Sequence, residues 1–472
     1  MVQLYSKKVM KHLLILAALC LSLTAAAQVY KQEGIVFKGK PLEVQNPLRM
    51  HKGGFTAVLW VKAAEQGSAT YEILGTQRWR IGVQENGAWY WKAGDYEYKP
   101  TPQRQTIRDG RTHMLAFVYD TLKKETSLYY DGKNVAIYYT PGLDSLNIAA
   151  LNIGGMAKGE LGEWETFYGE IPELSLYNSS TENIAYLYSL KVPPPRPMGP
   201  PKVPTALRVM NYNIWHGGNE TGKEIGPQRI VEIIQSSGAD IVSMQETYGS
   251  GAKIADALGY YFYLRSTNLS IMSRYPIAET LMGDAPFYNG GAYIKISDQQ
   301  KIAFFTNWLN YPYDYWDMLE KNQPINPDSL AVHMEKGNTA RLRSILKTIQ
   351  PHTANADKIP VIFCGDFNTG SHLDWIASTK KFNRNYVVRF PAGLALFDAG
   401  YKDAFRIVHP DPLKERGITW TPQFPNAFQD RIDYIYYKGA IIQPAKAWTI
   451  TTHPVKYPSD HAALVVEFKV QQ

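Results

Sequence analysis

The sequence predicts a multidomain protein in which an all-β domain is followed by an α/β domain. The chain has 472 residues, more than a single hydrophobic core usually serves. The stretch KVPPPRPMGPPKVP at 191–204 cannot continue a helix or a central strand, which indicates a polyproline spacer. Strand-like alternation dominates before this spacer, whereas apolar strand runs and helical periodicity follow one another after it. We therefore expect domains at 28–190 and 205–472.

The first residues indicate a signal peptide at 1–27. A lysine-containing segment precedes the apolar run HLLILAALCLSL, and the alanines at 25–27 form a cleavage site. The apolar run is too short to span a membrane comfortably. Lipid attachment through Cys20 is disfavoured because Leu19 directly precedes it. We expect cleavage after residue 27 and export of a soluble protein, periplasmic or extracellular, without a transmembrane segment.

The positive charge is unevenly placed along the chain. The formal net charge is +7, but most of the excess falls in 1–27 and 191–204. About +2 is left on 205–472, which gives little reason to expect a polyanionic partner.

Residues 28–190 show the patterns of an all-β domain. FTAVLWVKA at 55–63 alternates as a strand does, and TSLYYDGKNVAIYY at 126–139 places two such runs around Asp131-Gly132, a hairpin turn. Pro172 in GEIPELSLYN indicates an edge strand or a bulge. No long amphipathic helix is apparent in this part.

Together with LNIGG at 151–155, these stretches resemble the laminin-G/concanavalin-A-like jelly roll. The resemblance implies a β-sandwich that binds carbohydrate or supports a neighbouring domain, and it assigns no site residues. AWYWKAGDYEY at 88–98 is interpreted either as an exposed aromatic platform for sugar or as strand residues half buried in the core.

The C-terminal domain mixes strands with amphipathic helices. GPQRIVEIIQSS at 226–237 and NTARLRSILKTIQPH at 338–352 predict helices. In the second, apolar residues recur at i, i+3, i+4 and i+7, from Leu342 to Ile349.

Polar residues follow the predicted strands of this domain. IPVIFC stops at Gly365, and Asp366 and Asn368 come next, either as turn residues or as a catalytic pair. Cys364 in this strand is interpreted as a buried core thiol. Other strand ends carry the same kind of side chain: Asn213, Glu246, Asp433, Asp460 and His461. Such residues on the rim of one sheet scaffold indicate a single cleft.

The residue types suit metal-assisted attack of water on phosphorus. Glu246 and Asp460 are hard oxygen ligands, apt for Mg²⁺, with Mn²⁺ as the second candidate. His461, oriented by Asp433, is suited to remain protonated against developing negative charge. Asp366 can accept a proton from water.

Six motifs in order resemble the endonuclease/exonuclease/phosphatase superfamily. They are LRVMNYNIWHGG (207–218), DIVSMQET (240–247), IMSRYPI (271–277), VIFCGDFNTG (361–370), DRIDYIYYKG (430–439) and SDHAALVVEF (459–468). The resemblance implies a four-layer α/β sandwich of two packed mixed sheets flanked by helices. It implies that Asn213 lies in the phosphate and metal site, that Glu246 and Asp460 bind metal, and that Asp366 activates water. It further implies that Asn368 holds the phosphate and that His461, paired with Asp433, stabilises the transition state or assists departure of the leaving group.

Three further positions are weaker candidates for substrate binding. Trp308 stands where many members carry a histidine, and indole cannot act as an acid or as a cation. His216 lies near Asn213 in sequence, and His372 follows the GDFN motif and either lines the pocket or belongs to the start of the next helix. Residues 310–337 form an aromatic insertion, interpreted as a lid or as a packed surface loop.

The function predicted from these features is that of an exported divalent-metal-dependent phosphoesterase, with cleavage of a diester favoured. A secreted endonuclease acting on DNA or RNA is the nearest alternative. A carbohydrate-binding protein with an inactive phosphoesterase-like domain is the alternative from another class.

Overall fold

The computed structural model describes residues 28–48, 53–65, 69–143, 150–158, 163–192 and 203–471. The predicted signal peptide and most of the proline-rich spacer lie outside these residues. The chain divides into two compact units, Met1–Pro195 and Arg196–Gln472. Among the described residues, no helix is long and apolar enough to cross a membrane.

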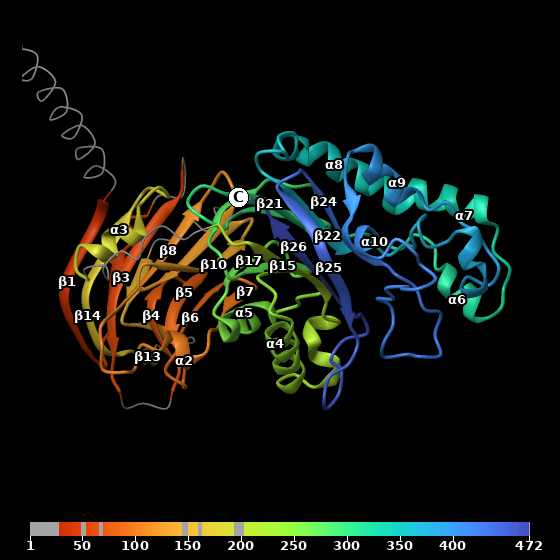
Figure 1. The fold of residues 1–472 in the computed structure, drawn as a ribbon. Helices are drawn as coiled ribbons and strands as arrows, with labels where there is room; N and C mark the ends of the chain where they lie inside the picture. The colour runs from red at the N-terminus through yellow and green to blue at the C-terminus, as the bar shows by residue number, and fades with distance from the viewer. Residues whose placement is uncertain are drawn as a thin grey trace, which may run out of the picture. The chain divides into compact units, whose positions relative to one another are not determined.

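The first unit is a sandwich of antiparallel sheets, as expected for a jelly roll (Figure 1). One sheet has the strand order β1-β14-β3-β8-β9-β10, and the other has the order β2-β11-β4-β5-β6-β7. The strands of the first sheet are β1 (Gln28–Lys38), β14 (Tyr168–Tyr177), β3 (Phe55–Ala63), β8 (His113–Asp120), β9 (Glu125–Tyr130) and β10 (Lys133–Tyr139). Those of the second are β2 (Leu42–Gln45), β11 (Ala150–Ile153), β4 (Tyr71–Gly75), β5 (Trp79–Val83), β6 (Trp89–Ala93) and β7 (Tyr96–Tyr98). The pair β12 (Gly155–Lys158) and β13 (Glu163–Thr166) and the short helices α2 (Pro102–Gln105) and α3 (Ile184–Ser189) complete the unit.

Two local predictions in this unit are confirmed. Asp131 and Gly132 adopt φ of 48° and 77° between β9 and β10, which is the left-handed geometry of a tight hairpin. Pro172 lies at a register shift between β14 and β3, so it marks a bulge. It does not mark an edge, because β14 is paired on both sides.

The aromatic run at 88–98 forms core strands and not an exposed platform. Trp89 and Trp91 of β6 are buried between the sheets, as alternation along a half-buried strand requires. Tyr90 points to the other face but is also buried. Its ring packs directly over Gly82, which has no side chain to displace it. The interpretation as an exposed aromatic platform is wrong, because aromatic composition alone does not specify exposure.

The second unit contains two mixed sheets with the orders β17-β18-β16-β15-β26-β25 and β19-β20-β21-β22-β24-β23. Within them, β15 pairs in parallel with β16, and β21 with β22, while the other pairs are antiparallel. The first sheet comprises β17 (Tyr261–Leu264), β18 (Leu269–Ser273), β16 (Ile241–Gln245), β15 (Ala206–Asn213), β26 (Ala463–Val470) and β25 (Ile442–Ile450). The second comprises β19 (Ile277–Leu281), β20 (Asn289–Lys295), β21 (Lys301–Trp308), β22 (Val361–Asp366), β24 (Asp433–Lys438) and β23 (Lys402–Asp403).

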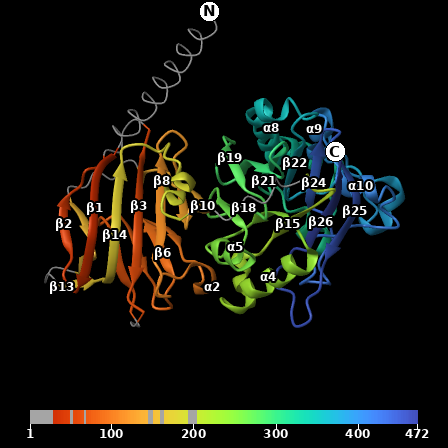
Figure 2. The same ribbon diagram turned by 60° about the vertical axis from the view of Figure 1, so that its left-hand side comes forward.

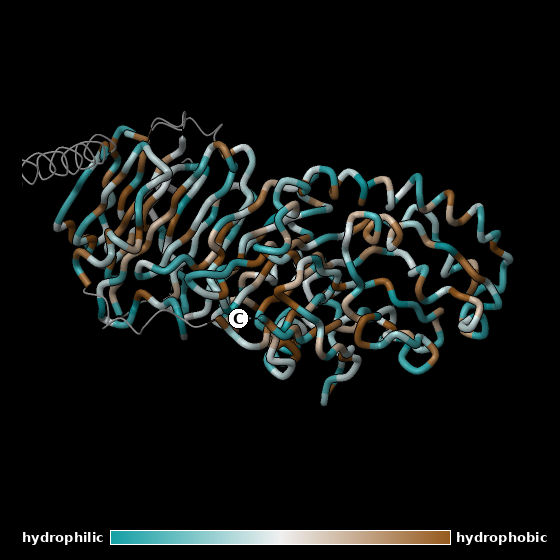
Figure 3. Tube along the Cα trace, turned by 45° about the horizontal axis from the view of Figure 1, so that its top comes forward, coloured by the Kyte–Doolittle hydropathy of each residue, from teal (hydrophilic) through white to brown (hydrophobic). Residues whose placement is uncertain are grey.

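Helices cover the outer faces of the two sheets, which gives the expected four layers (Figures 1 and 2). Leu342, Ile345 and Ile349 of α8 pack in one core with Phe305 of β21 and Phe363 of β22. Brown hydrophobic stretches recur along the strands in Figure 3. The helices are α4 (Ile225–Ser237), α5 (Gly251–Leu258), α6 (Tyr315–Glu320), α7 (Pro327–Met334), α8 (Ala340–Thr353), α9 (Pro391–Asp398) and α10 (Ala404–Val408), with shorter turns η2 (His216–Thr221), η3 (Glu335–Thr339) and η4 (Ala377–Phe382).

The insertion at 310–337 is anchored to the rest of the unit by buried aromatic residues, while many of its other residues are exposed. Tyr315 and Trp316 of α6 are buried in a core cluster with Trp375. All three donate hydrogen bonds to the buried carboxylate of Asp430, which fastens the insertion to the unit. Among the tyrosines and tryptophans of the insertion, Tyr311 is the exposed one, with 58% of its surface accessible.

Candidate active site

Strand register brings the polar strand ends of the second unit together. In the parallel pair of β15 and β16, Asn213 lies opposite Gln245, and Glu246 follows directly. In the other sheet, β22 ends at Asp366, opposite the first residue of the antiparallel β24, Asp433. The Nδ2 of Asn213 donates to Oδ2 of Asp366 at 3.1 Å and so links the two sheets. The predicted cleft is thus built from the ends of strands in both sheets.

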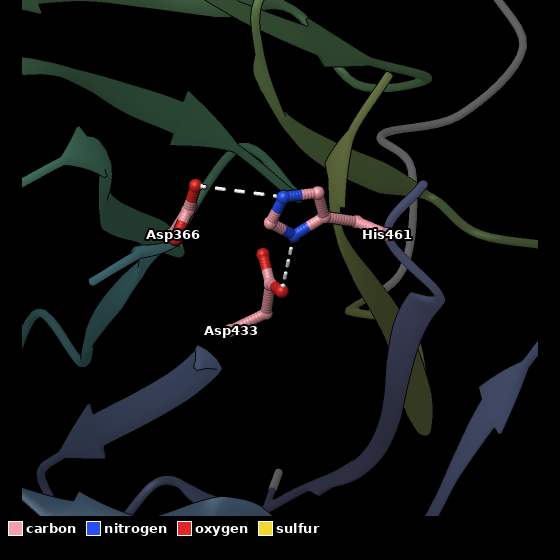
Figure 4. Close-up of side chains that lie close together, drawn as sticks. All are labelled: Asp366, Asp433 and His461. Atoms are coloured by element: carbon pink, nitrogen blue, oxygen red, sulfur yellow. Dashed lines mark hydrogen bonds and ion pairs between the residues drawn. The ribbon is translucent and has the colours of Figure 1, made fainter. Parts of the chain in front are cut away.

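His461 precedes β26 and is held by Asp433 (Figure 4). Its Nδ1 lies 2.9 Å from Oδ2 of Asp433, while its Nε2 lies 3.9 Å from Oδ2 of Asp366 and 4.0 Å from Oδ1 of Asp460. Burial alone lowers the pKa of this imidazole, but the surrounding carboxylates, Asp433 first, outweigh it and raise the pKa well above its ordinary value. This shift favours the imidazolium form, in which the Nε2–H faces Asp366 and Asp460.

Asp366 is a buried carboxyl group with defined orientation. Its Oδ1 accepts from the backbone N–H of Asn368 at 3.0 Å, and its Oδ2 accepts from the side-chain amide of Asn368 at 3.2 Å. The same amide donates to the carbonyl of Leu309 at 2.8 Å, which locks Asn368 in place. Burial raises the pKa of Asp366 to about 8, although the charge of His461 opposes the rise. Its affinity for a proton near neutral pH suits a general base.

Glu246 and Asp460 form a second acidic group beside Asn213. Glu246 adopts φ of 54°, accepts from Asn213 Nδ2 at 3.2 Å and from the backbone N–H of His216 at 2.9 Å. Burial raises the pKa of Asp460, and among its neighbours the charge of Glu246 raises it further while that of His461 lowers it. Among the described residues, Oδ1 of Asp460 is a buried oxygen without a hydrogen-bond partner.

This second group fits a hard divalent cation. Buried polar atoms almost always have a partner, so an Asp460 oxygen without a hydrogen bond, beside the charge of Glu246, is suited to a cationic ligand. Carboxylate and amide oxygens are the ligands that Mg²⁺ and Mn²⁺ prefer.

Another trio, Asp366, Asp433 and His461, has ligand atoms within 4.8 Å of one another. It is a poorer metal site because the imidazole Nδ1 is engaged with Asp433 and the ring is cationic, whereas a histidine ligand must be neutral. The arrangement is that of a charged hydrogen-bonded dyad beside a carboxyl group.

Comparison with known proteins places this geometry in a family. The sequence model described as "Endonuclease/Exonuclease/phosphatase family" matches residues 210–461, more than half of the chain. The chain belongs to this family. It is accordingly a phosphoric ester hydrolase of a group that uses divalent metals. Residues 39–183 match the model of the concanavalin A-like lectin/glucanases superfamily, in agreement with the first unit.

Individual relatives are distant. The chain is 27% identical over 292 residues to the uncharacterized protein F14F9.5 of Caenorhabditis elegans, covering 56% of this chain and 91% of that protein. An AP endonuclease from Archaeoglobus fulgidus is similar at 16% identity and a TM-score of 0.41, covering 56% of this chain and 100% of that one. The human Nocturnin catalytic domain is similar at 19% identity and a TM-score of 0.38, covering 57% of this chain and 95% of that one.

A buried polar chain stands behind the dyad in this family member. Asn211 of β15 donates to Oδ1 of Asp433 at 3.1 Å, and Nε2 of Gln245 donates to Oδ1 of Asn211 at 3.0 Å. Gln245 also donates to Ser243 at 2.8 Å and to Thr306 of the opposite sheet at 3.2 Å. The chain thus supports Asp433 from between the two sheets. Sequence reasoning missed Asn211 because it lies inside a strand and not at its end.

Asn338 is a second supporting residue that the sequence did not reveal. It lies in η3, where a widened turn separates α7 from α8, and it is fully buried. Its Nδ2 donates to the carbonyls of Phe367 at 3.2 Å and Asn368 at 3.4 Å. Widened helical turns frequently mark functional positions, but helical periodicity in the sequence does not disclose them.

The three weaker candidates lie in different places. His216 is exposed, with its Nε2 3.7 Å from Oε2 of Glu246, so it borders the acidic group. Trp308 ends β21 directly opposite Asp366 in the parallel register. His372 is not brought to the cluster: its ring packs edge-on against Phe397 of α9, with a centroid distance of 5.0 Å. His372 therefore lies near the GDFN motif in the sequence but packs against α9 in the structure.

Asp374, the neighbour of His372 in sequence, has a structural connection. Its carboxylate pairs with Arg406 at 2.6 Å and with Arg431 at 2.7 Å. Arg431 is fully buried and also pairs with Asp403 at 2.8 Å. This network ties the loop after β22 to the segment that leads into Asp433. Replacing one of these charged residues by a neutral one would leave the charge of its partner buried and uncompensated, which is strongly destabilising.

Proposed function

We propose that the protein is an exported, divalent-metal-dependent phosphodiesterase, with Mg²⁺ as the ion and Mn²⁺ as the second candidate. The observation that supports it most strongly is one juxtaposition. The imidazolium of His461, held by Asp433, faces Asp366 on one side and the unsatisfied oxygen of Asp460 on the other. A cationic donor, a proton acceptor and a hard-ion site around one cleft are the parts needed for hydrolysis at phosphorus.

The residues divide the work in the proposed reaction. Water attacks phosphorus, its proton passes to Asp366, a new P–O bond forms and the ester P–O bond breaks. The leaving oxygen takes a proton from solvent. The Nε2–H of His461 donates to a non-bridging phosphoryl oxygen, where negative charge grows, and Asp433 keeps that ring protonated.

Two asparagines position the reacting groups in this proposal. Asn368 orients Asp366 through two hydrogen bonds, and Asn213 connects Asp366 to Glu246. Glu246 and Asp460 would hold the metal ion. Asn213 would orient Glu246 and not bind the ion, because its Nδ2 faces Glu246 and its side-chain oxygen accepts from the backbone N–H of Trp215. When bound, such an ion neutralises charge on the phosphoryl oxygens and orients the substrate.

The direct test is hydrolysis of bis-p-nitrophenyl phosphate by the mature protein with Mg²⁺, with Mn²⁺ and with a chelator. We expect turnover that requires metal and that falls by about 10²–10⁴ in the Asp366→Ala variant. Turnover that persists in chelator, or that is equal in the variant, would refute the assignment. DNA and RNA in the same assay test the endonuclease alternative.

Export is a separate part of the proposal. It is supported by the basic and apolar pattern of residues 1–27, which lie outside the described residues. N-terminal sequencing of protein secreted by a host cell should find Gln28 as the first residue. Retention of Met1 or recovery in the cytosol alone would contradict export.

The first unit supplies a place for a polar ligand such as carbohydrate. A groove of about 730 Å³ lies on the face of β4, β5 and β6 that points away from the core. It is lined by charged and amide side chains and one tyrosine ring: Glu72, Arg80, Gln84, Tyr90, Lys92 and Glu97. We infer that this groove is the site of any sugar binding, and an Arg80→Ala variant should then lose retention on the glycan that the wild type binds.

A further inference from the structure

Four aromatic side chains form a continuous cluster at the end of β21. This cluster, called here the aromatic rim, consists of Phe287, Tyr288, Trp308 and Tyr311. The ring of Trp308 lies at its centre, with centroid distances of 5.5 Å to Phe287, 6.2 Å to Tyr288 and 6.2 Å to Tyr311. Phe287 and Tyr311 meet it nearly edge-on, while Tyr288 lies parallel to it.

The aromatic rim borders both halves of the candidate site. Trp308 lies opposite Asp366 in the register of β21 and β22. On the other side, Asn268 accepts from the backbone N–H of Glu246 and donates to the carbonyl of Phe287 at 3.0 Å. The rim therefore lies next to Asp366 on one side and next to Glu246 on the other.

Two members of the rim present apolar surface to solvent. Phe287 is 38% exposed and Tyr311 is 58% exposed, whereas Phe305 on the same strand as Trp308 is fully buried. Exposed aromatic residues that adjoin one another mark sites of ligand contact more often than isolated ones do.

The charges around the rim do not suit a polyanion. In the described part of the chain, the ion pairs of Glu246, Asp366, Asp433 and Asp460 are made with histidines, not with lysine or arginine. Arg341 is one cation next to the rim. It stacks over Tyr288 at 4.5 Å and pairs with Asp284 at 3.6 Å, so its charge is already balanced. Nucleic-acid polymers need unpaired cations along the path of their phosphates.

We propose that the aromatic rim binds the non-leaving substituent of a small phosphodiester by stacking. The substrate class is a diester with one phosphate whose second substituent is an uncharged ring, such as an aryl or sugar ring. Polymeric DNA or RNA does not meet this description. This inference rests on the proposed phosphodiesterase function and adds to it the part of the substrate that is recognised.

The test compares three diesters that share p-nitrophenolate as the leaving group and differ in the other substituent: methyl, phenyl and choline. With the leaving group constant, the change in the phenyl-to-methyl ratio of kcat/KM between the wild type and the rim variants isolates recognition of the ring, because intrinsic reactivity is the same for every protein. We expect the wild type to favour the phenyl ester by about tenfold, as stacking on one aromatic side chain predicts. In Tyr311→Ala and Phe287→Ala the ratio should fall toward one, mainly through KM.

Tyr186→Ala is the matched control, because Tyr186 is an exposed aromatic residue, 59% accessible, in the first unit. It should keep the wild-type ratio. A wild-type ratio near one, or a ratio that neither rim variant changes, would overturn the proposal. A preference for the choline ester that Tyr311→Ala abolishes would also overturn it, in favour of cation–π recognition.

Binding separates this inference from the proposed function. If no diester is hydrolysed with any metal, the phosphodiesterase assignment fails, and calorimetry in the presence of Mg²⁺ decides on the rim alone. Diphenyl phosphate should bind about tenfold more tightly than dimethyl phosphate. Tyr311→Ala should remove that difference. Equal affinities for the two compounds would end the proposal.

Discussion

Oδ2 of Asp433 lies 2.9 Å from Nδ1 of His461, and both side chains are buried. An imidazolium is costly in such surroundings unless carboxylates compensate it, and here three of them raise the pKa of the ring. The pair therefore keeps a charged hydrogen-bond donor in a place from which water is largely excluded. Electrostatic stabilisation by such a preorganised donor is often the largest contribution to catalysis.

The first prediction concerns this pair. His461→Ala and Asp433→Asn should each lower kcat by about 10²–10⁴, since the donor is removed in one case and left without its supporting charge in the other. The melting temperature should show that both variants fold. His333→Ala, which changes an exposed histidine in α7, is the control and should have wild-type kcat. A variant of the pair with wild-type turnover would disprove the assigned role.

The second prediction concerns the metal. An ion that binds the folded state alone raises the melting temperature. We expect Mg²⁺ to raise it for the wild type and not for Glu246→Gln or Asp460→Asn. Glu224→Gln, at an exposed position in front of α4, should respond as the wild type does. Equal Mg²⁺ responses in all four proteins would place the ion elsewhere.

Asp460 allows an opposite prediction in the absence of metal. Burial and the charge of Glu246 raise its pKa, so the folded state disfavours its carboxylate form. In chelator, Asp460→Asn should therefore melt at a higher temperature than the wild type, although it has lost the response to Mg²⁺. A lower melting temperature in chelator would show that the carboxylate is stabilising without an ion.

The third prediction tests the support behind the dyad. Asn211→Leu removes the hydrogen bond to Oδ1 of Asp433, and a hydrogen bond to a charged group contributes about 1.5–3 kcal/mol. If that support orients Asp433, kcat should fall by about tenfold or more with little change in KM. Ser237→Ala, which removes a buried hydrogen bond to the carbonyl of Ile234 in α4, is a control for general destabilisation. If Asn211→Leu lowers the melting temperature but keeps the wild-type kcat, Asn211 stabilises the fold and does not orient Asp433 for catalysis.

The ends of strands were predictable from the sequence, and the interior of the sandwich was not. Asn213, Glu246 and Asp366 could be identified because a polar residue directly after an apolar run is visible in one dimension. Asn211 occupies an ordinary alternating position of its strand, and only the opposing sheet shows that it contacts Asp433. Asn338 depends on a widened turn that periodicity does not encode.

Burial was the property that sequence reasoning judged least well. The residues of the run at 88–98 and of the insertion at 310–337 are aromatic, and aromatic side chains serve cores and binding surfaces equally well. The structure buries Trp89 and Tyr315 but exposes Tyr311. A buried and an exposed aromatic residue differ in the neighbours that distant segments of the chain bring to them. Tyr315, for example, is hydrogen-bonded to Asp430.

The last prediction concerns the stability of the first unit. His113 is buried with Nδ1 2.9 Å from Asp131 and Nε2 2.9 Å from Asp109, so both ring nitrogens must donate and the ring is cationic. Burial lowers the pKa of His113, but the hydrogen bonds to Asp131 and Asp109 outweigh it and raise the pKa overall. Burial likewise opposes ionisation of Asp109, but hydrogen bonds from His113 and Arg111 lower its pKa to about 2.

The sign of the pH dependence follows from these two shifts. A raised histidine pKa stabilises the fold below the unfolded value of about 6.5, and the effect is lost as the pH rises through the folded value. A lowered aspartate pKa stabilises it above about 3.9, and this effect is lost as the pH falls toward 2. The difference in melting temperature between the wild type and His113→Gln should therefore be largest at pH 4–6.5 and shrink toward pH 9. A difference that stays constant or grows over that range would show that His113 is neutral in the folded protein.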